Sequence, residues 1–178
     1  MPMDAPAEQR GTLDSVVNRI AGLLEHGGGT LTSGDVASLR RMDPSRPAAA
    51  FFKLAGVVLD GSLPLESHGR TEAETRWAAI VAGLACLGDL HRRGVRLGSA
   101  LVDAGFSELR FARLLRADAD RLVDELPMLA RFLAAKGVPA DWTQAAWLIL
   151  SSDRSDDERA RRNLAHDYYG ALARKGNN

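Results

Sequence analysis

Three arginines at intervals of three residues, Arg110, Arg113 and Arg116, are the side chains of this chain whose type and spacing best suit chemistry. In a helix, at about 100° per residue, they fall within an arc of roughly 120°. Phe111 and Leu114 lie on the opposite side of the same helix. A guanidinium is planar, permanently charged and rich in donors, which suits phosphate oxygens. The spacing therefore predicts a helix that packs on one face and binds a polyanion with the other.

Two further groups of arginines flank predicted turns. One group closes a helix near residue 40, and the other surrounds Gly94. Arginine near a helix C-terminus ordinarily compensates the helix dipole, so either group alone indicates a solvated helix end. If the fold brings all three groups to one side, they form a basic stripe despite a formal net charge of zero. The candidate nucleic-acid-binding residues are Arg40, Arg41, Arg92, Arg93, Arg96, Arg110, Arg113 and Arg116.

The residue types that carry catalysis or bind metals do not form a recognisable set. The four histidines are isolated in sequence, there is no HExxH motif, and Cys86 is the single cysteine. No serine lies in a GxSxG motif. An acidic cluster at 153–158 suits the positive end of a helix dipole, with metal binding as a minor alternative. We therefore expect no catalytic residue, no metal site, no cofactor and no enzyme activity.

The sequence shows no recognisable signal for secretion or for insertion into a membrane. The N-terminus lacks a basic segment followed by an apolar one, so it does not resemble a secretory signal. No run of 18 apolar residues occurs, which argues against a membrane-spanning helix. These features predict a soluble, cytoplasmic protein with no membrane partner.

The elements that must position the arginines are helices, because nearly every segment has a helical hydrophobic period and none has a convincing period of two. We predict an all-α fold, a helical bundle of about eight or nine helices. Residues 1–11 are expected to be a flexible tail, and residues 12–178 a single domain. Two small lobes, 12–93 and 97–178, are the alternative division.

Local signals support the helical assignment. Capping boxes are predicted at Thr32–Asp35, Thr71–Glu74 and Ser155–Glu158, each just before an apolar run. A further helix is expected to be offset or kinked at Pro127 and to end at Gly137. Agreement between the caps and the hydrophobic period favours the all-α fold.

The segment that begins at residue 99, SALVDAGFSELRFARLL, also fits a helix-turn-helix, with a glycine turn and a basic second helix. That pattern predicts base-reading side chains early in the second helix, such as Glu108 and Arg110. Against it, Leu109 and Phe111 are expected to face the core. The positive face also extends along the helix, as binding to a nucleic-acid backbone requires.

Three pieces of the chain resemble the small subunit of the type I-E CRISPR surveillance complex, Cascade, also called the CasB family. The first, at 38–56, is SLRRMDPSRPAAAFFKLAG; the second and most specific, at 97–118, is LGSALVDAGFSELRFARLLRAD. The third is VPADWTQAAWLIL, followed by an arginine-rich helix that ends in DYYGAL. Together the resemblance covers residues 28–173.

This resemblance implies an all-helical, non-enzymatic subunit that is present as a pair within Cascade. Its implied partners are the other Cascade subunits, the guide RNA, the target and displaced DNA strands, and a second copy of itself. Its implied role is to stabilise the R-loop in antiviral defence. Of the candidate residues, Arg40, Arg41, Arg110 and Arg116 match the family's motifs, whereas the other four come from the clustering of arginines alone.

The chain departs from the family at one place and leaves two alternatives open. The loop before the second piece is only HRRGVR, whereas the family's loop is often longer and basic. The alternatives are a helix-turn-helix DNA-binding regulator and a protein-only scaffold subunit. Acidic residues are expected to meet neighbouring protein subunits; they are Asp118, Asp120, Asp124 and Glu125.

Overall fold

The protein is all-α, as predicted. The computed structural model describes residues 7–26, 29–60, 63, 67–151 and 153–176, and within them forms nine α-helices and no strand. The helices are α1 (Ala7–His26), α2 (Ser33–Arg40), α3 (Ala49–Val58), α4 (Ser67–Leu87), α5 (Leu97–Asp103), α6 (Glu108–Arg116), α7 (Ala119–Lys136), α8 (Thr143–Leu150) and α9 (Arg154–Gly176). A short 3-10 turn, η1 (Gly88–Leu90), follows α4. Among these helices none is long and apolar enough to cross a membrane.

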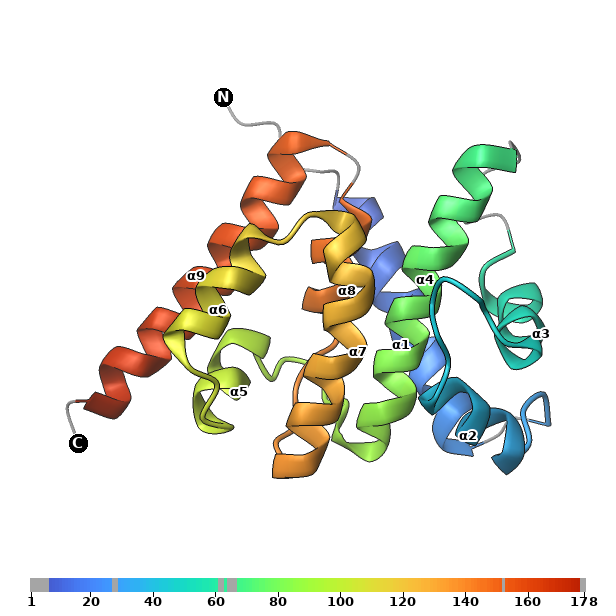
Figure 1. Cartoon of the computed structure of the whole chain (residues 1–178), viewed down its shortest axis with the longest axis horizontal. Helices are drawn as coiled ribbons and strands as arrows, with labels where there is room; N and C mark the ends of the chain where they lie inside the picture. The colour runs from blue at the N-terminus through green and yellow to red at the C-terminus, as the bar shows by residue number, and fades with distance from the viewer. Residues whose placement is uncertain (1–6, 27–28, 61–62, 64–66, 152, 177–178) are drawn as a thin grey trace.

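The long helices α4 and α7 lie side by side at the centre of the molecule (Figure 1). α2 and α3 lie on one side of this pair, and α5, α6 and α9 lie on the other. One hydrophobic core contains residues from before and after the predicted lobe boundary at 93–97. The division into one domain or two lobes remains a prediction.

Trp142 fixes the position of α8 against α4. Its indole is fully buried, and its Nε1 donates a hydrogen bond to the carbonyl oxygen of Ile80 at 3.2 Å. The ring lies directly on Gly83, where an added Cβ would come within 2.4 Å of Trp142 Cζ2. A residue without a side chain is therefore required at this point of α4.

Two aromatic rings hold α6 on α9. Phe111 of α6 stacks on Tyr168 of α9 with ring centroids 3.7 Å apart and an interplanar angle of 6°. The Tyr168 hydroxyl donates a hydrogen bond to the carbonyl oxygen of Phe106 at 2.6 Å. Burial raises the pKa of this hydroxyl. Because Phe111 and Tyr168 are almost completely buried, the opposite face of α6 is turned outward.

The helix boundaries confirm some of the predicted signals. At α2 the Thr32 hydroxyl accepts from the backbone N–H of Asp35 at 3.1 Å, and the Asp35 carboxylate accepts from the Thr32 N–H at 2.9 Å, which is the predicted capping box. Gly137 ends α7 with a φ of 65°, the left-handed conformation that glycine favours. α7 continues through Pro127 as one helix.

Other predicted boundaries are wrong. α4 begins at Ser67, so Thr71 lies inside the helix, where its carbonyl accepts from the Thr75 hydroxyl. α9 begins at Arg154 because Asp153 accepts from the Asp156 N–H at 2.8 Å, ahead of the predicted cap at Ser155. α1 begins at Ala7, so the described part of the segment predicted as a tail is helical; the tail itself stays a prediction, because residues 1–6 lie outside the described residues.

His91 joins three parts of the core through both of its ring nitrogens. Nδ1 accepts from the backbone N–H of Trp142 at 3.1 Å, and Nε2 lies 3.2 Å from Oδ1 of Asn18. The Asn18 amide nitrogen donates to the carbonyl of Asp14, which leaves its oxygen facing the histidine. These contacts require the neutral ring with a proton on Nε2.

Protonation of His91 would therefore break the bond from Trp142. Burial lowers the pKa of His91 below its usual 6.5, and the nearby guanidinium of Arg93 acts in the same direction. The carboxylates of Asp141 and Glu25 oppose this shift without reversing it. The folded state thus binds a proton at this ring less readily than the unfolded chain does.

We predict that acid destabilises the protein through His91. Above about pH 6.5 the His91 ring is neutral in both the folded and the unfolded state, and its hydrogen bonds stabilise the fold fully. As the pH falls below that value, the unfolded chain binds a proton first. The free energy of unfolding should then fall by up to about 1.4 kcal/mol per pH unit. Urea denaturation between about pH 7.5 and 5.5 measures this, and His91→Gln should lack this part of the decline. An equal decline in both proteins would contradict the assignment.

Candidate nucleic-acid interface

The three arginines of α6 form the exposed face that the sequence predicts. All three side chains are at least partly exposed, whereas Phe111 and Leu114 on the other side of α6 are 0% and 1% exposed. The break before α6 is made by Gly105, which has a φ of 78°. We call Arg110, Arg113 and Arg116 the α6 arginine face.

Arg110 is held in place by two aromatic rings. Its guanidinium carbon lies 4.6 Å from the ring centroid of Phe106 and 5.2 Å from that of Phe132 on α7. A guanidinium over an aromatic face is attracted by the ring and retains its charge. The arginine is therefore preorganised, with its donors available for an anion.

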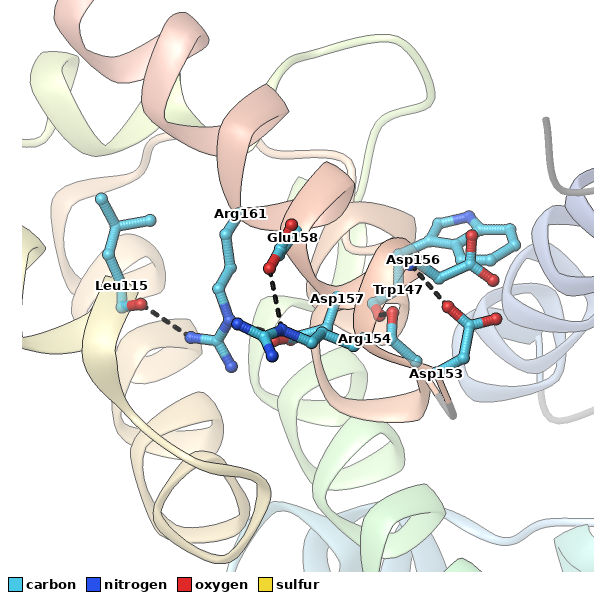
Figure 2. Close-up of polar contacts among 9 residues, drawn as sticks. Leu115, Trp147, Asp153, Arg154, Asp156, Asp157, Glu158 and Arg161 are labelled. Carbon is cyan, nitrogen blue, oxygen red and sulfur yellow. Dashed lines mark hydrogen bonds and ion pairs between the residues drawn. The ribbon is translucent and has the colours of Figure 1, made fainter. Parts of the chain in front are cut away.

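The α6 arginine face lacks carboxylate partners. Across the described residues, Arg110, Arg113 and Arg116 form no ion pair. The arginines at the start of α9 contrast with this, because Arg154 pairs with Glu158 at 3.1 Å and Arg161 pairs with Asp157 at 2.8 Å (Figure 2). In the described structure the α6 arginines thus have no ion-pair partner, whereas Arg154 and Arg161 of α9 each have one.

The acidic cluster that begins α9 has a structural role. Asp153 caps the helix, Asp156 pairs with Arg159, and Asp157 holds Arg161. Arg161 in turn donates to the carbonyl oxygen of Leu115 at 2.8 Å, near the end of α6 (Figure 2). Within the residues described, no group of acidic, histidine or cysteine side chains could hold a metal ion.

Arg40 forms hydrogen bonds within the protein through both its side chain and its carbonyl group. Its Nε donates to the carbonyl oxygen of Ala85 near the end of α4 at 2.8 Å. Its own carbonyl accepts from Nη2 of Arg131 on α7 at 3.1 Å. Arg41, the C-cap of α2, is exposed. Arg131 was missed by the sequence pattern because it lies in an amphipathic helix with no neighbouring arginine.

In the described structure, two arginines of the 92–96 group form no ion pair and the third forms one. Arg92 and Arg93 are exposed, and within the described part of the chain neither forms an ion pair. Arg96 pairs with Asp167 of α9 at 2.9 Å, although 70% of its side chain remains exposed. The side chain of Gln144 also donates to Asp167, so Arg96 belongs to a network that joins α5, α8 and α9.

The three arginine groups are only partly brought together. Adjacent residues of α7 reach two of them, because Arg131 contacts Arg40 and Phe132 contacts Arg110. Among the described residues no hydrogen bond, ion pair or ring contact links the 92–96 loop to either group. The contacts therefore place two groups around α7 and the third near the start of α5.

One prediction about α6 is wrong. Leu109 was expected to face the core, but it is 65% exposed. At helical spacing it falls within the arc of Arg113 and Arg116. The α6 arginine face is thus a mixed surface, with an apolar side chain between its charges.

These features define an all-helical protein whose core positions an exposed arginine-bearing helix. The chain belongs to the family described as CRISPR-associated protein Cse2, whose family model matches residues 35–169. It is therefore a structural subunit of Cascade, the type I-E CRISPR complex, and works with other Cas proteins. The family resemblance drawn from the sequence is confirmed.

Solved structures of the same family are similar in fold. The chain matches CasB from Thermobifida fusca with a TM-score of 0.64 and 17% identity, over 90% of this chain and 97% of that one. It matches CasB from Thermus thermophilus with a TM-score of 0.58 and 21% identity, over 94% of this chain and 100% of that one. No curated protein matches the sequence.

Proposed function

We propose that this protein is a non-catalytic Cascade subunit that binds the nucleic-acid backbone and stabilises the R-loop, including the displaced strand. The observation that carries the proposal is the α6 arginine face, whose three guanidinium groups reach solvent and, in the described structure, are free of carboxylate partners. Arg41, Arg92 and Arg93 are secondary contacts, being exposed as well. Arg40 and Arg96 contribute less, because their donors already serve the fold.

Backbone binding suffices for this role. R-loop formation exchanges one duplex for another of similar stability, so modest contacts to phosphates shift the balance. Unpaired arginines supply such contacts without reading sequence. The protein would act in the cytoplasm on the guide RNA, the target strand and the displaced strand, beside a second copy of itself. Acidic residues of α7 that reach the surface, such as Asp120 and Asp124, would meet neighbouring subunits.

Two alternatives make different predictions. A helix-turn-helix regulator would return a preferred operator from a selection with random duplex DNA, whereas backbone binding returns no motif. The position of Arg110 against Phe106 and Phe132 favours backbone binding over a helix-turn-helix, because the Arg110 side chain is held against α7. A protein-only scaffold would keep its affinity for other subunits and show no DNA affinity that depends on arginine.

We predict that the isolated chain binds single-stranded DNA weakly and in a salt-dependent manner through α6. Replacing Arg113 and Arg116 with glutamine should reduce the slope of log K against log salt concentration by roughly 1.4, about 0.7 for each phosphate that is no longer neutralised. Arg110 is left unchanged in this test because its side chain also covers two rings. Fluorescence anisotropy of a labelled oligonucleotide measures the slope.

A control of equal charge change replaces two arginines elsewhere with glutamine: Arg19 on α1, and Arg70 on α4, which pairs with Glu74. Both helices are separated from α6 in the fold (Figure 1). The control should keep the slope of the original protein. Equal slopes for both double variants would remove α6 from the binding surface.

A further inference from the structure

A groove between α6 and α7 combines an apolar floor with charged walls. Its cavity measures about 210 Å³. Leu114 and Leu129 in its lining are 1% and 4% exposed, whereas Met128 is 56% exposed. A cavity of this size is too small for a helix, which is about 10–12 Å across with its side chains. The charged residues that line the groove are Arg110, Arg113 and Glu125.

One wall of the groove is a preorganised stacking surface. Phe106 lines the groove, and the Arg110 guanidinium lies over its ring. Phe106 and Phe132 themselves form an edge-to-face pair with centroids 5.4 Å apart. Unstacked bases of single-stranded nucleic acids stack on aromatic rings and on guanidinium planes. Because Phe106 is only 7% exposed and already lies under Arg110, the flat surface that a nucleobase can contact here is the exposed guanidinium of Arg110.

The groove also offers one donor and one acceptor that are not used by the protein. Arg113 and Glu125 both line it, yet in the described structure neither forms an ion pair or a side-chain hydrogen bond. A guanidinium can donate to ring nitrogens and carbonyl oxygens of a base, and a carboxylate accepts from an exocyclic amine. Cytosine has such an amine at the ring position where thymine has a carbonyl oxygen.

We propose that the α6–α7 groove receives one unstacked nucleobase of the strand whose phosphates the α6 arginine face binds, with a preference for a base that carries an exocyclic amine. This inference rests on the proposed function and adds a base contact to it. The charge complementarity between two arginines and a phosphate chain selects a nucleic acid as the occupant. The apolar lining and Glu125 distinguish the groove from a surface that binds phosphates alone.

The test compares three oligomers of about ten units on the full chain: oligodeoxycytidine, oligothymidine and an abasic deoxyribose-phosphate chain. Oligodeoxycytidine should bind at least about fivefold more tightly than the abasic chain and about fivefold more tightly than oligothymidine. Glu125→Gln should abolish the difference between the two bases. Met128→Ala should weaken oligodeoxycytidine binding and leave abasic binding unchanged. Val57→Ala, at an exposed apolar residue of α3, is the matched control.

Each result decides between this inference and the proposed function. Equal affinity for all three oligomers, with binding still dependent on salt, would overturn the base contact and leave backbone binding intact. Absence of salt-dependent binding to any oligomer would overturn both. If Met128→Ala releases the subunit from assembled Cascade without changing oligomer affinity, the groove is a protein interface and the base contact is wrong.

Discussion

Gly98→Ala is expected to destabilise the protein by about 3 kcal/mol, because α5 and α9 are in backbone contact at this residue. An added Cβ would lie 2.6 Å from the carbonyl oxygen of Leu164 and 2.6 Å from the backbone nitrogen of Tyr168. It would also lie 2.8 Å from Cβ of Asp167. None of these atoms is the end of a flexible side chain, so relief requires the two helices to move apart. Movement of α9 would also disturb the stacking of Tyr168 on Phe111.

Gly56→Ala is the matched control for this prediction. Gly56 lies within α3, and a Cβ there would meet no atom within 4 Å. Alanine in an open helical position should stabilise the protein by about 0.5–1 kcal/mol. Urea denaturation of both variants measures the contrast. If Gly98→Ala unfolds at the same urea concentration as Gly56→Ala, the close packing of α5 on α9 is incorrect.

The helical fold and the arginine arc could be predicted because both depend on local spacing. The hydrophobic period places Phe111 inward and Arg113 outward, and Gly105 separates the two helices, as the structure confirms. Helix starts were less predictable, since several polar residues near a boundary can act as the cap. At α9 it is Asp153, rather than Ser155, whose side chain accepts from the first turn.

The environment of each arginine could not be predicted, because its partners are distant in sequence. Arg110 lies over Phe132 of the next helix, and Arg96 pairs with Asp167, 71 positions later. Helical periodicity assigns a residue to a face but does not say what covers that face. The prediction that Leu109 faces the core was wrong because it followed the apolar residue type; helical spacing groups Leu109 with Arg113 and Arg116, and 65% of it is exposed.

In the described structure, exposure without an ion pair distinguishes the α6 arginines from Arg154, Arg159 and Arg161 of α9, and Arg92 and Arg93 share this property with α6. α9 also carries several arginines in its first half, yet Arg154, Arg159 and Arg161 are all paired with carboxylates of the same helix. Such pairs within a helix contribute little stability but reduce the local positive potential. A count of arginines alone would therefore point to α9, although three of its arginines are paired with carboxylates.

R-loop lifetime in reconstituted Cascade tests the central claim most directly. With Arg113→Glu and Arg116→Glu in the subunit, two favourable phosphate contacts become repulsive, and the lifetime should fall by about tenfold or more at roughly 0.15 M salt. The control, Arg19→Glu with Arg70→Glu, makes the same change of charge away from α6 and should leave the lifetime unchanged. Gel analysis of the purified complex confirms that both variants are incorporated. An unchanged lifetime with the α6 variant incorporated would contradict the proposed role of the α6 arginine face.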